Sequence, residues 1–140
     1  MFDLSGKNIV ITGSSKGIGK AIAHQMALAG AKVTISSRKT DICEEVAKEI
    51  NDSLPEGSSG QAIVIPCNIN SKESLQNLVD ETHKQLGDIH ALVCNAALNP
   101  FFGPSTEIPD EAFDKIMSAN IKSNHWLCNM VLPEMNARKD

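Results

Sequence analysis

Three glycines near the start of the chain have the spacing of a turn that could hold an anion. Residues 12–19 read TGSSKGIG, and they stand between the apolar run at 9–11 and a segment with helical periodicity. A strand, a turn without side-chain bulk and a helix N-terminus bring unpaired N–H groups and the positive end of the helix dipole together. The first interpretation is a dinucleotide-binding turn, although its spacing, G-x-x-x-G-x-G, is not the usual G-x-G-x-x-G.

Basic side chains follow the second predicted strand. In NAD-selective versions of such a turn, an acidic residue about 20 positions after the glycines bonds the adenosine ribose hydroxyls. Here Ser37 stands eighteen residues after Gly19, and Arg38 and Lys39 come next. A guanidinium can hold a 2′-phosphate through two parallel hydrogen bonds, whereas a carboxylate would repel it. Together with Lys16 in the turn, this favours NADP over NAD. The alternative is that Arg38 and Lys39 are solvated loop charges.

Polar and small residues end two later strands. Asn68 follows the strand expected over 61–67, where it could lie beside the edge of an adenine or cap its own backbone in a turn. Asn95, Ala96 and Ala97 follow the strand expected over 89–94. Small side chains there would let a flat ring approach the carboxyl end of the sheet, or the two alanines would simply pack under a helix.

The elements that must position these residues alternate between strands and helices. Apolar runs predict parallel strands over 7–12, 31–36, 61–67 and 89–94. Periodicity predicts helices over 18–29, from a capping pair Asp41 and Glu44 onward, over 71–86 and over 110–137. This order predicts a single α/β domain, a doubly wound parallel sheet in three αβα layers.

The last predicted helix has two asparagines on its apolar side. Its expected buried stripe is formed by Phe113, Met117, Asn120, Asn124, Leu127, Val131 and Met135. A buried asparagine must find partners, so the two are either satisfied core residues or part of a site. The preceding segment 99–109, with three prolines and two phenylalanines, is expected to be a stiff loop that forms a substrate wall or covers the sheet edge.

Composition argues against several classes of protein. The 140 residues contain 13 Lys and Arg and 17 Asp and Glu, a net charge of −4 without blocks of like charge. We therefore expect no nucleic-acid or membrane partner. The four cysteines are far apart and lack metal-ligand spacing, so we expect reduced thiols in a cytoplasmic protein and no metal. No stretch approaches the ~18 apolar residues of a membrane span.

In this order and spacing, the glycine turn at 12–19, the N-A-A at 95–97 and Asn120 resemble the short-chain dehydrogenase/reductase superfamily. The resemblance covers essentially the whole chain, and the stretch CNAALNPFFG at 94–103 is similar to the carbonyl reductase subgroup. It implies a Rossmann fold and hydride transfer between NADP(H) and a small-molecule carbonyl or alcohol substrate.

The resemblance also implies roles for particular residues. The implied cofactor-binding residues are Gly13, Ser14, Ser15, Lys16, Gly17, Ile18, Gly19, Ser37, Arg38, Asn68, Ile69, Asn95, Ala96 and Ala97. Asn68 stands where the family more often has an acidic residue for the adenine amino group, and an amide oxygen can accept the same bond. Asn120 is the implied catalytic position, where a main-chain carbonyl at a local kink holds a water of the proton relay.

The resemblance further implies a Ser, and a Tyr and Lys in Y-x-x-x-K, downstream of Asn120. The Lys lowers the pKa of the Tyr, which acts as acid or base. The sequence has no tyrosine. We therefore expect residues 1–140 to form an incomplete NADP-binding Rossmann domain, truncated after the fourth strand and its following helix, with the C-terminal catalytic half absent. A free strand edge and an apolar helix face would then favour a homo-oligomer.

Three hypotheses of function follow. In the first, the chain is the cofactor-binding half of an NADP-dependent carbonyl reductase or alcohol dehydrogenase, inactive alone. In the alternative, it is a non-catalytic nucleotide-binding module or a split-gene fragment that acts through a partner. A weaker third hypothesis is a structural remnant that binds nothing.

Overall fold

Strands and helices alternate along the chain in a computed structural model that describes residues 2–139. The strands are β1 (Asn8–Thr12), β2 (Lys32–Ser36), β3 (Gln61–Val64) and β4 (Ala91–Val93). The helices are α1 (Gly17–Leu28), α2 (Thr40–Ser53), α3 (Lys72–Leu86), α4 (Asp110–Met117) and α5 (Ser123–Arg138). A π-helical turn, Ser118–Lys122, joins α4 to α5, and a 3₁₀ turn spans Ser105–Glu107.

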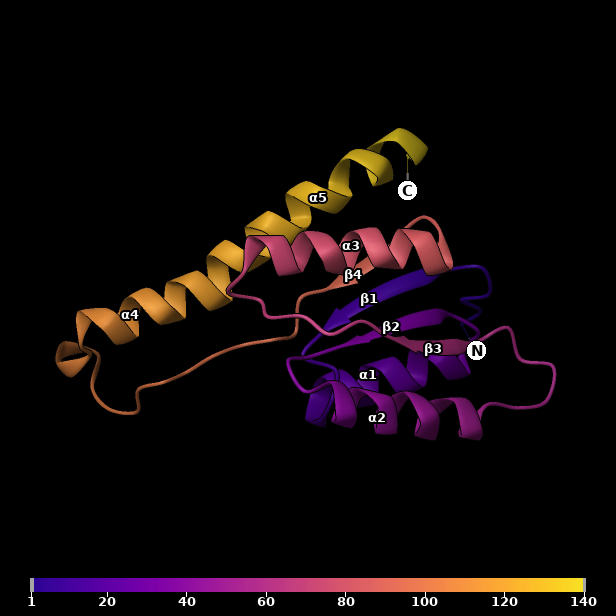
Figure 1. The fold of residues 1–140 in the computed structure, drawn as a ribbon, viewed down its shortest axis with the longest axis horizontal. Helices are drawn as coiled ribbons and strands as arrows, with labels where there is room; N and C mark the ends of the chain where they lie inside the picture. Colours follow the sequence, from indigo (N-terminus) through magenta and orange to yellow (C-terminus); the bar gives the residue numbers. More distant parts are fainter. Residues whose placement is uncertain (1, 140) are drawn as a thin grey trace.

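The four strands form one parallel sheet in the order β3-β2-β1-β4. Helices α1 and α2 cover one face, and α3 and α5 cover the other (Figure 1). Each face of the sheet has its own hydrophobic core. The residues of β1 pack alternately into one core and the other, because successive strand side chains point to opposite faces. Ile9 and Ile11 pack with the α1 and α2 side, and Val10 packs with Leu78 and Leu127 on the other side. The predicted doubly wound, three-layer α/β fold is confirmed.

Helix starts differ in how well the sequence predicted them. Asp41 and Glu44 were expected to cap α2, but its N-cap is Lys39 and no side chain caps it. That prediction is wrong, and Asp41 lies in the first turn, where its charge favours the helix dipole. Ser71 does cap α3, because its hydroxyl accepts the N–H of Ser74 at 3.1 Å.

The expected long helix after residue 110 is interrupted by the π-helical turn. Its buried stripe holds only in α5, where Leu127 and Val131 are 0% and 1% exposed. Phe113 and Met117 in α4 are 50% and 42% exposed, so their predicted burial is wrong. The reason is that α4 extends beyond the sheet, where it has no layer to pack against (Figure 1). The third and fourth strands are also shorter than predicted.

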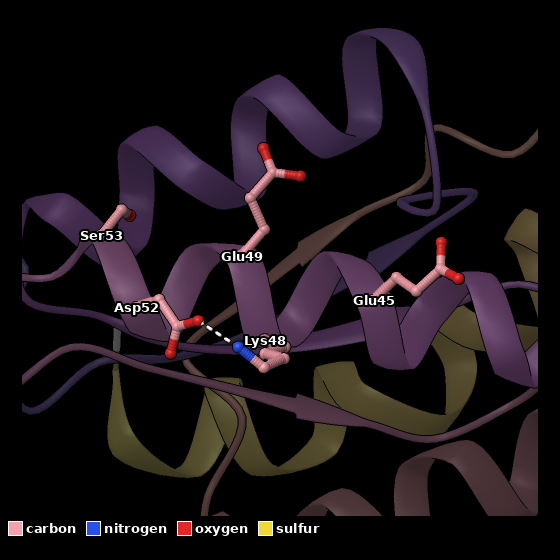
Figure 2. Close-up of a pocket in the computed structure, with 5 residues that line it drawn as sticks. All are labelled: Glu45, Lys48, Glu49, Asp52 and Ser53. Atoms are coloured by element: carbon pink, nitrogen blue, oxygen red, sulfur yellow. Dashed lines mark hydrogen bonds and ion pairs between the residues drawn. The ribbon is translucent and has the colours of Figure 1, made fainter.

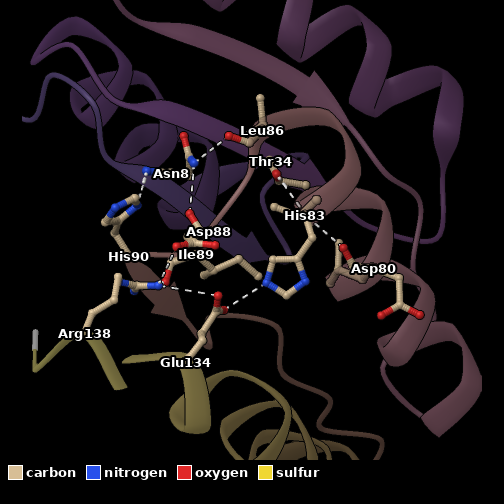
Figure 3. Close-up of polar contacts among 12 residues, drawn as sticks. Asn8, Thr34, Asp80, His83, Leu86, Asp88, Ile89, His90, Glu134 and Arg138 are labelled. Carbon is tan, nitrogen blue, oxygen red and sulfur yellow. Dashed lines mark hydrogen bonds and ion pairs between the residues drawn. The ribbon is translucent and has the colours of Figure 1, made fainter. Parts of the chain in front are cut away.

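A polar network fastens α3 and α5 to the amino end of β1 and β4 (Figure 3). The amide nitrogen Nδ2 of Asn8 donates to the carbonyls of Leu86, the last residue of α3, and of Asp88, in the segment that follows. Arg138 in α5 donates to the carbonyl of Ile89 at 2.7 Å, and the guanidinium lies 3.4 Å from the Asp88 carboxylate. These bonds set the start of β4 in register with β1, at the end of the sheet opposite the glycine turn.

Strand β4 lies at one edge of the sheet and pairs with β1. Its three residues are half-buried, whereas all five residues of β1 are buried. Among residues 2–139, the helices are each too short or too polar to cross a membrane.

Candidate functional site

The carboxyl ends of three strands bring the predicted site residues to one end of the sheet. Thr12, which ends β1, pairs in register with Ser36 at the end of β2. On the other side, Ile11 pairs with Val93 at the end of β4. The segments that follow, 13–19, 37–38 and 95–97, therefore share the end at which open parallel sheets bind ligands.

Thr12 and Asn95 clamp the glycine turn to the end of β4. The Thr12 hydroxyl oxygen accepts the backbone N–H groups of Asn95 and Ala96, each at 3.1 Å. In return, Asn95 Nδ2 donates to the carbonyls of Thr12 at 3.2 Å and Gly13 at 3.0 Å. The side chain of Asn95 therefore shapes the site by holding the backbone of the glycine turn at Thr12 and Gly13. Thr12 was missing from the predicted site residues. Its position directly before the first glycine of the turn was the sequence feature that could have indicated it.

Two of the three glycines allow close packing inside the site. A Cβ on Gly13 would lie 2.8 Å from the Ala96 Cα, and one on Gly19 would lie 2.4 Å from the Gly13 carbonyl oxygen. Gly13 and Gly17 both have a positive φ, +65° and +57°, but a Cβ on Gly17 would meet nothing within 4 Å. The turn thus needs Gly17 for its backbone conformation, and it leaves open space where a ligand can approach that backbone.

The N-terminus of α1 suits an anion. The first N–H groups of a helix lack acceptors within the helix. No side chain caps α1, its N-cap is Lys16, and its first turn has no acidic residue. Lys16, Gly17 and Ile18 are exposed and Ser15 is half-buried. The helix dipole and the N–H groups therefore fit the pyrophosphate of a dinucleotide.

Ser14 has a structural role. Its side chain is fully buried, and its hydroxyl donates to the Ile11 carbonyl at 2.7 Å. The same oxygen accepts the Ser36 N–H at 2.8 Å, while the Ser14 N–H donates to the Ser36 carbonyl at 3.1 Å. Both donors of Ser14 are therefore used inside the fold, where they hold the turn against β2, and a contact between Ser14 and the cofactor stays a prediction.

The end of β2 carries an unpaired positive charge next to a fixed hydroxyl. Ser37 is half-buried, and its oxygen accepts the N–H of Lys39 at 3.2 Å. The same oxygen lies 3.1 Å from the sulfur of Cys43 in α2. Arg38 is exposed, and the ion pairs found within residues 2–139 do not involve it. The Arg38 guanidinium is thus available to an anionic group at this corner of the site.

The side chain of Asn68 caps its own backbone in a turn, which was the alternative to contact with an adenine. Its side-chain oxygen accepts the N–H of Asn70 at 3.1 Å, and its own N–H donates to the Ser74 hydroxyl at 2.9 Å. Ile69 beside it packs partly against the α3 and α5 core. Asn68 is exposed, and an amide oxygen has a second lone pair, so adenine contact stays a prediction.

Asn120 lies in the π-helical turn and holds the start of the loop after the site. Its side chain accepts the Leu98 N–H at 2.8 Å and donates to the Leu98 carbonyl at 2.9 Å. Its main-chain carbonyl accepts the amide of Asn124 at 2.9 Å. The resemblance implied a kink at this position, and a π-helical turn is found there. Asn124 is a satisfied polar residue.

The four cysteines are free thiols. Burial, together with the neighbouring Cys128, raises the pKa of Cys94, next to Asn95, to about 11. A thiol that stays protonated at neutral pH is neither a nucleophile nor a metal ligand. Within residues 2–139, no three His, Cys, Asp or Glu side chains lie together as a metal site would require.

A hollow on the surface of α2 has the wrong charge for a nucleotide (Figure 2). It is lined by Glu45, Lys48, Glu49, Asp52 and Ser53. The ammonium group of Lys48 is paired with Asp52, and Glu49 binds Lys20. The two lysines are thus already paired with carboxylates, and Glu45 adds a negative charge, so the hollow offers no cation for phosphate groups and the site at the strand ends is the better candidate.

A glycine turn, an uncapped helix N-terminus and an asparagine clamp at the carboxyl end of a parallel sheet are the arrangement typical of dinucleotide-binding α/β proteins. The model of the short chain dehydrogenase family matches residues 7–140. Dehydrogenase/reductase SDR family member 4 of Bos taurus is 37% identical over 135 residues, which are 96% of this chain and 47% of that protein. Human dehydrogenase/reductase SDR family member 2, mitochondrial, is 36% identical over 97% of this chain and 47% of its own length.

Solved structures agree with these sequence matches. A hydroxysteroid dehydrogenase from Escherichia coli superposes with a TM-score of 0.86 at 34% identity, over 97% of this chain and 55% of that one. A metagenomic short-chain oxidoreductase in complex with NADP has a TM-score of 0.86 at 29% identity, over 97% of this chain and 59% of that one. The chain belongs to the short-chain dehydrogenase family of oxidoreductases. It spans about half the length of the curated relatives it matches.

Proposed function

We propose that this chain is the cofactor-binding half of an NADP(H)-dependent short-chain dehydrogenase/reductase that acts on a small carbonyl or alcohol substrate, as in the carbonyl reductase subgroup. The observation that carries the proposal is the exposed Arg38 beside Ser37 at the end of β2, with no carboxylate next to them. A similar structure is in complex with NADP, which supports the choice of nucleotide.

Each part of the nucleotide has suitable residues. The α1 N-terminus and Lys16 would hold the pyrophosphate, Arg38 would hold the 2′-phosphate by charge-assisted bonds, and Asn95 to Ala97 would line the ring. When bound, the nicotinamide would supply or accept a hydride. The Asn120 carbonyl accepts Asn124 through one lone pair, and its second lone pair would accept a water hydrogen in the proton relay.

We infer that the 140-residue chain does not catalyse turnover by itself, because it contains no tyrosine to serve as the acid. Catalysis would then need groups supplied from outside these residues.

The second candidate, a nucleotide-binding module or split-gene fragment acting through a partner, is favoured by the free edge of β4. We also propose a homo-oligomer and a cytoplasmic location, the latter on the free thiols. The printed name of one relative places that protein in mitochondria.

Calorimetric titration with NADPH and NADH tests the cofactor. We expect tighter binding of NADPH, and we expect Arg38→Ala to weaken NADPH binding about 10- to 100-fold, the effect of losing hydrogen bonds to a charged group. Binding of NADH should not change. Lys32→Ala makes the same charge change at the opposite end of β2 and should leave both affinities as they are. Equal affinities in the wild type, or no effect of Arg38→Ala, would remove NADP from the proposal.

Absorbance of NADPH, followed with small dicarbonyls or aldehydes, tests the inferred inactivity. We expect no oxidation by the chain alone, and steady turnover would refute this. The coding sequence beyond Asp140 separates the two candidates. A continuation that encodes S…Y-x-x-x-K supports the enzyme half, whereas a stop codon together with retained NADPH binding supports the module.

A further inference from the structure

The hydroxyl of Ser37 rests on a buried thiol. Its oxygen lies 3.1 Å from the sulfur of Cys43, in the first turns of α2. Cys43 is 0% exposed and packs in the core shared by β1, β2, α1 and α2. The backbone N–H of Lys39 donates to the same Ser37 oxygen at 3.2 Å. The thiol of Cys43, in α2, and the N–H of Lys39, just before α2, therefore both contact the Ser37 oxygen at the edge of the site.

The direction of the hydrogen bond between these side chains decides what Ser37 offers to a ligand. A hydroxyl has one hydrogen and two lone pairs, and a thiol is a weak donor and a weak acceptor. The Lys39 N–H fills one lone pair of Ser37. If the Cys43 S–H fills the other, the Ser37 hydrogen is left to point outward. If Ser37 donates to the sulfur instead, its free lone pair faces the ligand.

These two directions differ for a phosphate and for a hydroxyl. A phosphate oxygen is an acceptor only, so it requires the hydrogen of Ser37 and is repelled by a lone pair. The ribose 2′-hydroxyl of NADH is both donor and acceptor, so it binds either arrangement. A group that fixes Ser37 as a donor would therefore favour NADPH without affecting NADH.

We propose that Cys43 is a positioning residue for the 2′-phosphate of NADPH: its S–H donates to Ser37, and Ser37 then donates to the phosphate beside Arg38. The inference rests on the proposed function, since it assumes that the nucleotide binds at the end of β2. Cys43 touches no ligand and acts through Ser37 alone. Cys43 would thereby fix Ser37 as a hydrogen-bond donor to the phosphate, in addition to the positive charge that Arg38 provides.

The test compares Cys43→Val, which keeps apolar bulk and removes the donor, with Cys43→Ser, which keeps a donor. Calorimetry is carried out with NADPH and with NADH, and the melting temperature is recorded for each variant. We expect Cys43→Val to weaken NADPH binding about three- to tenfold, the effect of one hydrogen bond, with NADH within about twofold of wild type. Cys43→Ser should retain the wild-type ratio of the two affinities.

Cys67→Val is the matched control. Cys67 is also a buried cysteine, 4% exposed, bonded to a serine hydroxyl, that of Ser74. Its backbone N–H donates to the Ser37 carbonyl at 3.0 Å, and this bond is kept in valine. Its side chain contacts Ser74 near Asn68, where any effect would act on the adenine that both nucleotides share, so its replacement should not change the NADPH to NADH ratio. A changed ratio in this control would overturn the assignment to Cys43 in particular.

The outcomes separate the inference from the proposed function. An unchanged ratio in Cys43→Val, or an equal loss for both nucleotides, overturns the role of Cys43 and leaves the proposed function intact. A wild type that binds neither nucleotide overturns both. If Cys43→Val is too unstable to titrate, Cys43→Ala is combined with Ser37→Ala. The Cys43→Ala effect on NADPH should vanish in that background, and additive losses would overturn the inference.

Discussion

The side chain of Thr12 connects segments that lie 83 and 84 residues apart in the sequence, since its oxygen accepts the N–H groups of Asn95 and Ala96. The glycines and Arg38 could be found from spacing and charge, because their roles depend on local backbone and on a missing carboxylate. Thr12 was visible as a threonine before the first glycine, but the contacts of Thr12 and Cys43 could not be found from the sequence, since they form only when β4 and α2 are folded against β1 and β2. Spacing alone also could not show that Ser14 is used inside the fold.

Replacing Thr12 by valine keeps the shape of the side chain and removes the acceptor of two backbone N–H groups. We expect Thr12→Val to lower the free energy of unfolding by about 1–3 kcal/mol, since partly buried donors would be left without a partner. Urea denaturation measures this change. The control is Thr34→Val in β2, whose hydroxyl meets Thr82 only at 3.4 Å and which should cost less than about 1 kcal/mol. Equal losses in the two variants would contradict the role given to Thr12.

At the scale of elements, four strands and the helices between them followed from apolar runs and helical periodicity. The π-helical turn Ser118–Lys122 did not, because one extra residue barely changes an apolar pattern read over a long segment. The side chains around it explain how the turn is held. Ser123 donates to the carbonyl of Ala119, and Asn124 donates to that of Asn120, so two carbonyls in the irregular stretch are satisfied.

The two bonds between Asn120 and Leu98 are the attachment of the 99–109 loop to this turn. We expect Asn120→Ala to speed hydrogen exchange of the Leu98 amide at least about tenfold, because that amide loses its acceptor. Nuclear magnetic resonance or mass spectrometry follows the exchange. Asn129→Ala, at an exposed position of α5 where the amide pairs with His125, is the control and should leave Leu98 protected. Unchanged protection in Asn120→Ala would show that the loop is held by other contacts.

At the scale of the whole molecule, β4 has a free edge and α4 extends beyond the sheet (Figure 1). Phe113, Met117 and Ile121 are 50%, 42% and 58% exposed. The alternation of strands and helices predicted the parallel sheet correctly, and the free edge that followed from the family resemblance is found beside β4 within residues 2–139. The sequence predicted the wrong burial for α4, since periodicity identifies an apolar side of a helix but not whether a neighbour exists to cover it.

We expect the chain to self-associate at micromolar concentration, because apolar side chains and an unpaired strand edge favour contact with other chains. Sedimentation velocity should show species larger than the 15.1 kDa monomer. Phe113→Glu combined with Met117→Lys should shift the population toward the monomer, while the two new charges support each other within α4. Phe2→Glu, at a residue that is 90% exposed at the other end of the chain, should not. A cooperative, monomeric wild type would contradict this expectation.

The π-helical turn also fixes how the chain can change in length. A single inserted residue in an α-helix rotates everything on one side of it by about 100° relative to the other side. A π-helical turn instead absorbs one extra residue within a single widened turn, so deleting one residue between Ser118 and Lys122 would restore a regular helix and leave Phe113 and Met117 facing as they do now. The residue that such a deletion would displace is Asn120, which lies in the widened turn and makes both bonds to Leu98.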